Sequence, residues 1–161
     1  MLAVIEKSEN GYIARFERQF DHSVEEVWSW LTDNEKLAKW FNELRVGELR
    51  EGGFMKFDMG DGNFEKMAIT DLKDQSVLEF TWGSDMAVRF ELSTEAPGCK
   101  LFLIEKIEKI TPHTPKDLAG WHVCLDVIKA LMEGETIERM EEWKKWYEKY
   151  KQAVEKVSPN A

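Results

Sequence analysis

The stretch GWHVCLDVIKALMEG (120–134) places a histidine, a cysteine and an aspartate within five positions: His122, Cys124 and Asp126. An imidazole can act as a general base, a thiolate as a nucleophile, and a carboxylate can orient either group. The apolar spacing of the stretch predicts a helix, on which successive residues are rotated by about 100°. His122 and Cys124 then point about 200° apart and cannot form a thiolate–imidazole pair. We interpret Cys124 as a small core residue.

His122 and Asp126 lie one helical turn apart, so their side chains can touch. The same face carries Lys129 and Glu133, which favours a solvent-exposed polar stripe over a functional pair. A metal site would need more ligands directed at one point, and the other two histidines fall in predicted loops. The sequence therefore predicts no catalytic residue and no metal ligand.

The segment DMGDGNFE (58–65) superficially resembles a calcium-binding loop. Counting from Asp58, however, Gly60 and Gly62 fall at positions where such a loop supplies oxygen ligands. We interpret the segment as a hairpin turn. The chain contains neither a phosphate-binding loop nor a dinucleotide fingerprint, and we predict no cofactor.

The 161 residues carry a formal net charge of −9, which disfavours binding to nucleic acids or to anionic membrane surfaces. No apolar run reaches the ~18–20 residues of a membrane-spanning helix, and the N-terminal residues do not form a signal peptide. The two cysteines have neither metal-site spacing nor a disulfide pattern. We expect a soluble cytoplasmic protein that does not insert into a membrane. The oligomeric state is not determined by the sequence.

The N-terminal part predicts one strand followed by two short helices. Residues 11–20 alternate between apolar and polar types, as in a half-buried strand. Ser23 three residues before Glu26 forms a capping-box pattern that predicts the start of a helix. The same pattern, Thr32 with Glu35, predicts a second short helix.

Between 43 and 109 the sequence alternates with period two between short glycine-containing turns, which predicts about six strands of an antiparallel meander. In one of these strands Met55, Phe57 and Met59 are expected to share a face. A single antiparallel sheet must bury its apolar face against another element. The long helix predicted over about 115–133 is the best candidate to cover this face.

Two helices are predicted at the C-terminal end. The first spans about 115–133, with Thr114 as its N-cap and Gly134 ending it. The second spans about 137–156, with Thr136 as its N-cap. We see no repeat and no linker, so a single domain over 1–161 is expected.

Large aromatic and methionine side chains are more numerous than a domain of this size requires. Any one of them can simply fill a close-packed core, but as a group they could line a cavity for a flat apolar ligand. The predicted ligand-binding residues are Trp40, Phe41, Phe57, Met59, Met67, Phe80, Trp82, Phe90, Trp121 and Leu125.

Four segments in order carry a resemblance to a known family. They are VWSWLTDNEKLAKWF (27–41), REGGFMKF (50–57), VLEFTW (77–82) and GWHVCLDVIKALMEG (120–134). The chain resembles the START-related, polyketide-cyclase-like helix-grip proteins. More narrowly, it resembles the family named for the C-terminal domain of the activator of heat-shock protein 90 ATPase. The resemblance covers about 11–134 and leaves 135–161 as an additional C-terminal helix.

The resemblance implies an α+β helix-grip fold: a curved antiparallel sheet of about seven strands wrapped around the long C-terminal helix, with an internal cavity. In related proteins the cavity holds lipids, flavonoid-like molecules, hormones or polyketides. The family's aromatic positions match Trp40, Phe41, Trp82 and Trp121, which are implied to border the cavity.

Three functions follow as hypotheses. The first is a non-catalytic binding protein for a small hydrophobic or aromatic molecule. The second is a chaperone-associated or regulatory interaction protein, suggested by the acidic surface and by an aromatic last helix on which Trp146 lies outside the main apolar stripe. The third is a cyclase- or hydrolase-type enzyme, which would need polar groups in the pocket. Arg89 is expected to point outward and Glu65 to lie at a turn, neither with an evident partner.

Overall fold

The computed structural model describes residues 2–158, which form eight strands and four helices. The strands are β1 (Val4–Ser8), β2 (Gly11–Phe20), β3 (Leu44–Glu48), β4 (Phe54–Asp58), β5 (Phe64–Lys73), β6 (Val77–Trp82), β7 (Met86–Glu95) and β8 (Gly98–Ile107). The helices are α1 (Val24–Thr32), α2 (Asn34–Trp40), α3 (Thr114–Met132) and α4 (Arg139–Val157).

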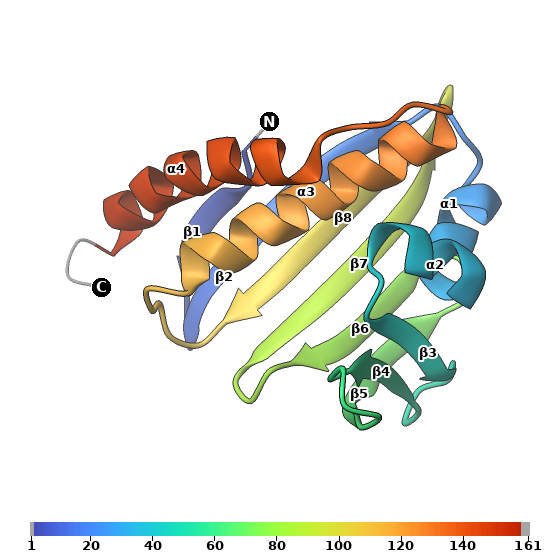
Figure 1. The fold of residues 1–161 in the computed structure, drawn as a ribbon, viewed down its shortest axis with the longest axis horizontal. Coiled ribbons are helices and arrows are strands. Elements are labelled where there is room, and N and C mark those ends of the chain that lie inside the picture. The colour runs from blue at the N-terminus through green and yellow to red at the C-terminus, as the bar shows by residue number, and fades with distance from the viewer. Residues whose placement is uncertain (1, 159–161) are drawn as a thin grey trace. The chain divides into compact units, whose positions relative to one another are not determined.

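The strands form one open sheet in the order β1-β2-β8-β7-β6-β5-β4-β3 (Figure 1). The meander β3 to β8 confirms the six strands predicted after residue 43, and the α+β fold class is confirmed with it. The sheet has eight strands, not about seven, because the sequence reasoning missed β1. That strand pairs with β2 from Val4↔Arg15 to Ser8↔Gly11. Its side chains are mostly exposed, so it has no buried alternation for a pattern to detect.

The chain divides into two compact units. The first comprises Met1–Phe16 and Lys106–Ala161, and the second comprises Glu17–Glu105. The prediction of a single domain over 1–161 stays a prediction.

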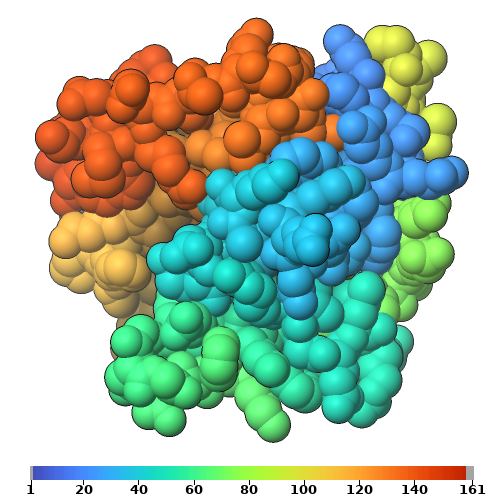
Figure 2. Space-filling view, turned by 45° about the vertical axis from the view of Figure 1, so that its right-hand side comes forward, coloured from blue at the N-terminus to red at the C-terminus, as the bar shows by residue number. Residues whose placement is uncertain are grey.

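Helices α1 and α2 of the second unit begin at polar caps, as expected. The Ser23 hydroxyl accepts the Glu26 N–H at 3.1 Å and starts α1. The cap of α2 is Asp33, whose carboxylate accepts the Glu35 N–H at 3.0 Å. The prediction of Thr32 as this cap was wrong, because Thr32 still belongs to the last turn of α1 and its hydroxyl donates to a carbonyl of that helix. Figure 2 shows α1 and α2 as the blue to cyan surface beside the teal and green strands of this unit.

In the first unit α4 packs against α3 and against β1. Helix α3 begins at Thr114 with His113 in the cap position, so Thr114 is one residue inside the helix. Gly134, at φ +73°, follows the end of α3 as predicted. Helix α4 begins at Arg139, two residues later than the sequence suggested. Among the described helices none is long and apolar enough to span a membrane.

Candidate ligand-binding site

Three half-buried aromatic rings of the second unit form a closed triangle. Phe41, Phe57 and Trp82 come from the end of α2, from β4 and from the end of β6. The ring centroids are 6.0 Å apart for Phe41–Phe57, 5.9 Å for Phe41–Trp82 and 6.0 Å for Phe57–Trp82, and the interplanar angles are 72–86°. Edge-to-face packing of this kind is the arrangement that the ring quadrupole favours. We call these residues the aromatic triad.

Local backbone geometry brings the triad together. Phe41 is the C-cap of α2, and its backbone leaves the helix at φ −144° and ψ 89°. Phe57 lies opposite Leu44 of β3 and Glu65 of β5, near the end of its strand. Trp82 is the last residue of β6, and the chain turns immediately at Gly83, whose φ of +67° favours glycine. All three rings therefore lie where an element ends.

A buried aromatic layer continues from the triad. Trp40 contacts Phe41 at 6.0 Å, Phe80 contacts Trp82 at 6.3 Å, and Phe90 contacts Phe80 at 6.4 Å. Trp40, Phe80 and Phe90 are fully buried. The Trp40 indole donates to the Trp30 carbonyl at 2.7 Å, which satisfies its only polar atom. Six of the predicted ligand-binding residues thus form one contiguous series of rings that runs from the core to the partly exposed triad.

The other four predicted residues do not belong to this ring series. Met67 is buried on β5. Trp121 and Leu125 are buried on α3, in the first unit. Met59 lies beyond the end of β4 and is 54 % exposed, so it does not share the buried face of Met55 as predicted. The strand ends before Met59 because the chain already turns there.

The segment 58–63 is that turn, as predicted. The Asp58 carboxylate accepts the Gly60 N–H at 2.8 Å, and the Asp61 carboxylate accepts the Asn63 N–H at 3.0 Å. The bond from Asn63 holds the pKa of Asp61 below its usual value. These carboxylates therefore stabilise the turn itself. In the described part of the chain no group of three potential ligands is arranged to hold a metal ion.

One polar residue of the inner layer escaped the sequence reasoning. Glu105 of β8 is completely buried and alternates with the buried Leu101 and Leu103. Burying a carboxylate is costly unless its surroundings compensate the charge or neutralise it. The strand pattern marks its position, but charged residues in such positions are usually interpreted as exposed.

Arg89 does have partners, contrary to expectation. Its guanidinium contacts two carboxylates from other strands, Asp71 of β5 at 2.9 Å and Glu79 of β6 at 3.2 Å, and one from its own strand β7, Glu91 at 2.5 Å. The hydrogen bond from Arg89 lowers the pKa of Asp71. The bond to Glu91, with those to the other two carboxylates, raises the pKa of Arg89. We call these four residues the Arg89 cluster, which joins the strands across their polar face.

His122 is buried, so the prediction of a solvent-exposed stripe was wrong for this residue. It is 1 % exposed, its Nδ1 lies 2.7 Å from the Tyr150 hydroxyl, and its Nε2 lies 3.4 Å from the Asp126 carboxylate. Its ring stacks on Trp146 of α4 with centroids 3.9 Å apart. Trp146 therefore contacts α3, which weakens the suggestion that it is a free contact residue for a partner protein.

The cysteines are buried and reduced. Cys124 lies in the core, as predicted, with the Arg139 guanidinium 3.5 Å from its Sγ. Burial raises the pKa of the Cys99 thiol, which suppresses the reactive thiolate. Cys124 lies beside a cation, but both thiols are buried and so lack the exposure of a nucleophilic cysteine.

The fold and the aromatic site define a class: an α+β protein with an open antiparallel sheet, a long C-terminal helix and an apolar, ring-lined site without a metal cluster among its described residues. The family described as "Activator of Hsp90 ATPase homolog 1-like protein" matches residues 21–133. The chain belongs to this family. The match includes the whole aromatic triad and all of α3. No curated protein is similar enough in sequence to match.

Solved structures of the same fold include three informative ones. A conserved protein of unknown function from Enterococcus faecalis, EF2215, is 29% identical over 94% of this chain and 91% of its own, with a TM-score of 0.78. CalU16 from Micromonospora echinospora is 23% identical over 94% and 95%, with a TM-score of 0.69. DynU16, from the dynemicin biosynthetic locus, is 21% identical over 75% and 47%, with a TM-score of 0.64. The last two establish likeness of fold alone.

Proposed function

We propose that this protein binds a small hydrophobic or aromatic molecule at the aromatic triad and is not an enzyme. The observation that carries the proposal is the triad itself. Three rings from separate elements meet edge to face and stay partly exposed, although the rings behind them are buried. Burying such surface is favourable by about 25 cal/mol per Å², so a partly exposed aromatic surface is suited to a ligand.

The chemistry of the triad suits a flat, uncharged ligand. Its side chains carry no ionisable group, so they present a mainly apolar surface to a ligand. Small-molecule sites typically combine such an apolar lining with one or a few polar contacts. A cytoplasmic location is proposed with this function, as is a lipid, flavonoid or polyketide-like ligand class.

Native mass spectrometry of the purified protein tests the proposal. The protein is measured alone and with a panel of flavonoids, fatty acids and polyketide-like aromatics. A retained mass or a one-to-one adduct with an aromatic member of the panel is expected. If no member binds to the folded protein, the triad is part of a solid core and the proposal fails.

A second function, a cyclase-type enzyme on the same fold, is favoured by one observation. Glu105 places a completely buried carboxylate on an apolar strand face, and burial of this kind is how proteins adapt a carboxyl group to proton transfer. The same spectra distinguish the two functions, because an enzyme converts a bound panel member to a product of different mass and loses this conversion in Glu105→Gln. Unchanged ligand in every complex leaves binding as the function.

A further inference from the structure

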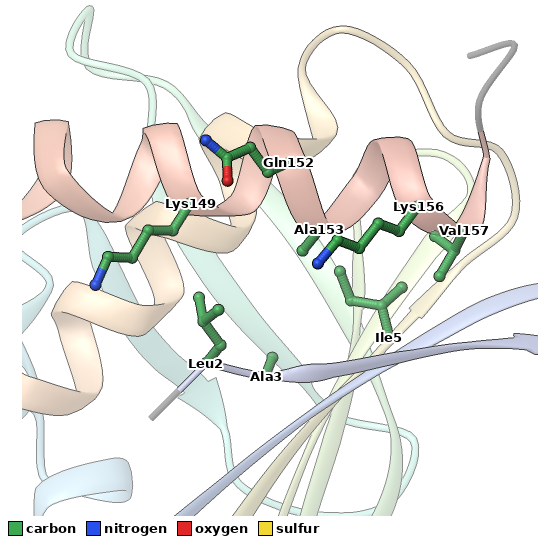
Figure 3. Close-up of a pocket in the computed structure, with 8 residues that line it drawn as sticks. All are labelled: Leu2, Ala3, Ile5, Lys149, Gln152, Ala153, Lys156 and Val157. Carbon is green, nitrogen blue, oxygen red and sulfur yellow. The ribbon is translucent and has the colours of Figure 1, made fainter.

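A separate groove lies in the first unit, between the N-terminal residues and α4 (Figure 3). Its volume is about 280 Å³. Leu2, Ala3 and Ile5 line it from the strand side, and Ala153 and Val157 line it from α4. Figure 3 shows the Leu2 and Ile5 side chains pointing toward α4. These five side chains give the groove an apolar floor.

The walls of the groove are held in place by hydrogen bonds. The Ala3 N–H donates to the Tyr150 hydroxyl at 2.9 Å, which ties the start of the chain to α4. Tyr150 is also 2.7 Å from the buried His122 of α3. Helix α4 is therefore fixed against two other elements, and the groove is formed before any ligand arrives. A preformed site avoids part of the entropic cost of binding.

The polar groups at the groove are cationic or neutral. Lys149, Gln152 and Lys156 line it, and no carboxylate of residues 2–158 does. Among residues 2–158 neither lysine makes an ion pair with a carboxylate; the Lys149 ammonium lies 4.6 Å from the centre of the Trp146 ring. Figure 3 shows the Lys156 side chain running along α4 so that its nitrogen lies by Ala153. In a chain with a net charge of −9, this groove has the opposite local charge.

We infer that the groove binds a medium-chain fatty carboxylate, with its carboxylate at Lys156 and its alkyl chain along the apolar floor. An apolar floor beside unpaired cations complements a molecule with a hydrocarbon body and an anionic end. A small inorganic anion would leave the floor unused, and a neutral hydrocarbon would leave the lysines unused. The volume is slightly below the ~300–1,000 Å³ of drug-sized sites, which suits one unbranched chain. This site is distinct from the aromatic triad, and the inference does not depend on the proposed function.

Decanoate is the probe, and the methyl resonances of Ile5 and Ala153 in the labelled full-length protein are the readout. Saturable shifts of both resonances are expected. Because Lys156→Gln removes a charge-assisted hydrogen bond to the carboxylate, this variant should bind at least about tenfold more weakly. Ala153→Phe, which fills the groove, should abolish binding. The matched control is Lys145→Gln: Lys145 also lies over the Trp146 ring but does not line the groove, and this variant should change affinity less than about twofold.

Two results would overturn the inference. Binding of decanol as tight as that of decanoate would mean that Lys156 plays no part. Alternatively, decanoate binding that survives Ala153→Phe and disappears in Trp82→Leu would place the carboxylate at the aromatic triad instead. The second result would leave the proposed function intact, so the two failures are distinguishable.

Discussion

The His122 imidazole of α3 stacks on the Trp146 indole of α4, with ring centroids 3.9 Å apart and 29° between the ring planes. The Tyr150 hydroxyl, one turn further along α4, approaches the Nδ1 of the same imidazole at 2.7 Å. One buried histidine thus contacts two successive turns of the last helix. Since α4 is otherwise strongly charged and its side chains are mostly exposed, these contacts contribute to its docking on α3.

Tyr150→Phe is expected to destabilise the protein by about 1–3 kcal/mol, the usual cost of leaving buried polar groups without a partner. The variant removes the hydroxyl that contacts both the Ala3 N–H and His122. Urea denaturation provides the measurement. Tyr147→Phe, on the same helix but half-buried, is the control and should stay within about 0.5 kcal/mol of the parent. Equal stabilities for the two variants would mean that the buried hydroxyl has no structural role.

Arg89→Met is expected to destabilise the second unit. The variant removes the positive charge that Asp71, Glu79 and Glu91 share, and the Glu79 carboxylate is nearly buried. Arg50→Met removes a comparable ion pair with Glu48, but both side chains of that pair are largely exposed. The control should therefore change stability by no more than about 0.5 kcal/mol. Thermal unfolding of the two variants and the parent provides the measurement. Equal midpoint temperatures for the two variants would contradict the structural role of the Arg89 cluster.

Acid sensitivity should also change in Arg89→Met. Arg89 lowers the pKa of Asp71 below the ordinary value of 3.8, so the unfolded chain binds this proton more readily than the folded protein. The stabilisation is therefore complete above about pH 4 and is lost as the pH falls through the folded-state pKa. Without Arg89 this component is absent. Denaturation curves at pH 5 and pH 3 should show a smaller loss of stability for the variant than for the parent, and an identical loss would argue against the linkage.

Two glycine substitutions should have opposite effects. A Cβ on Gly53 would collide with the carbonyl oxygen of Glu48, a backbone atom that cannot move aside easily. Gly53→Ala should therefore destabilise the β3–β4 hairpin. Gly120 lies inside α3 with open space around a built Cβ, so Gly120→Ala should stabilise the protein by about 0.5–1 kcal/mol. Equilibrium denaturation measures the change in the free energy of unfolding for each variant. A stabilising Gly53→Ala would contradict the close approach of residue 53 to the Glu48 carbonyl oxygen.

Trp82→Leu should weaken binding of an aromatic ligand by about tenfold or more, which corresponds to about 1.4 kcal/mol. It removes the ring that contacts both Phe41 and Phe57. Phe64→Leu is a suitable control, because Phe64 belongs to the same unit but is largely exposed and outside the triad. Titration by isothermal calorimetry with a ligand identified by mass spectrometry measures both affinities. Equal losses in the two variants would place the ligand elsewhere.

Local patterns in the sequence were enough to predict the meander, the long helix and the cap at Ser23. Alternation, capping residues and turn glycines act between near neighbours in the chain, so they are visible without the fold. Four ordered motifs were likewise enough to indicate the family. The start of α2 was misplaced by one residue, because Thr32 and Asp33 are both good caps and only the backbone angles distinguish them.

The burial of polar groups depends on residues far apart in the sequence, and only the tertiary structure determined it. His122 looked exposed on its own helix, but it is buried because Trp146 and Tyr150 cover it from α4. Arg89 looked unpartnered, but its three carboxylates come partly from neighbouring strands. The meeting of the aromatic triad likewise depends on where α2, β4 and β6 end. Periodicity assigns a face to a residue; the packing of other elements against that face decides whether it meets water, a partner or a ligand.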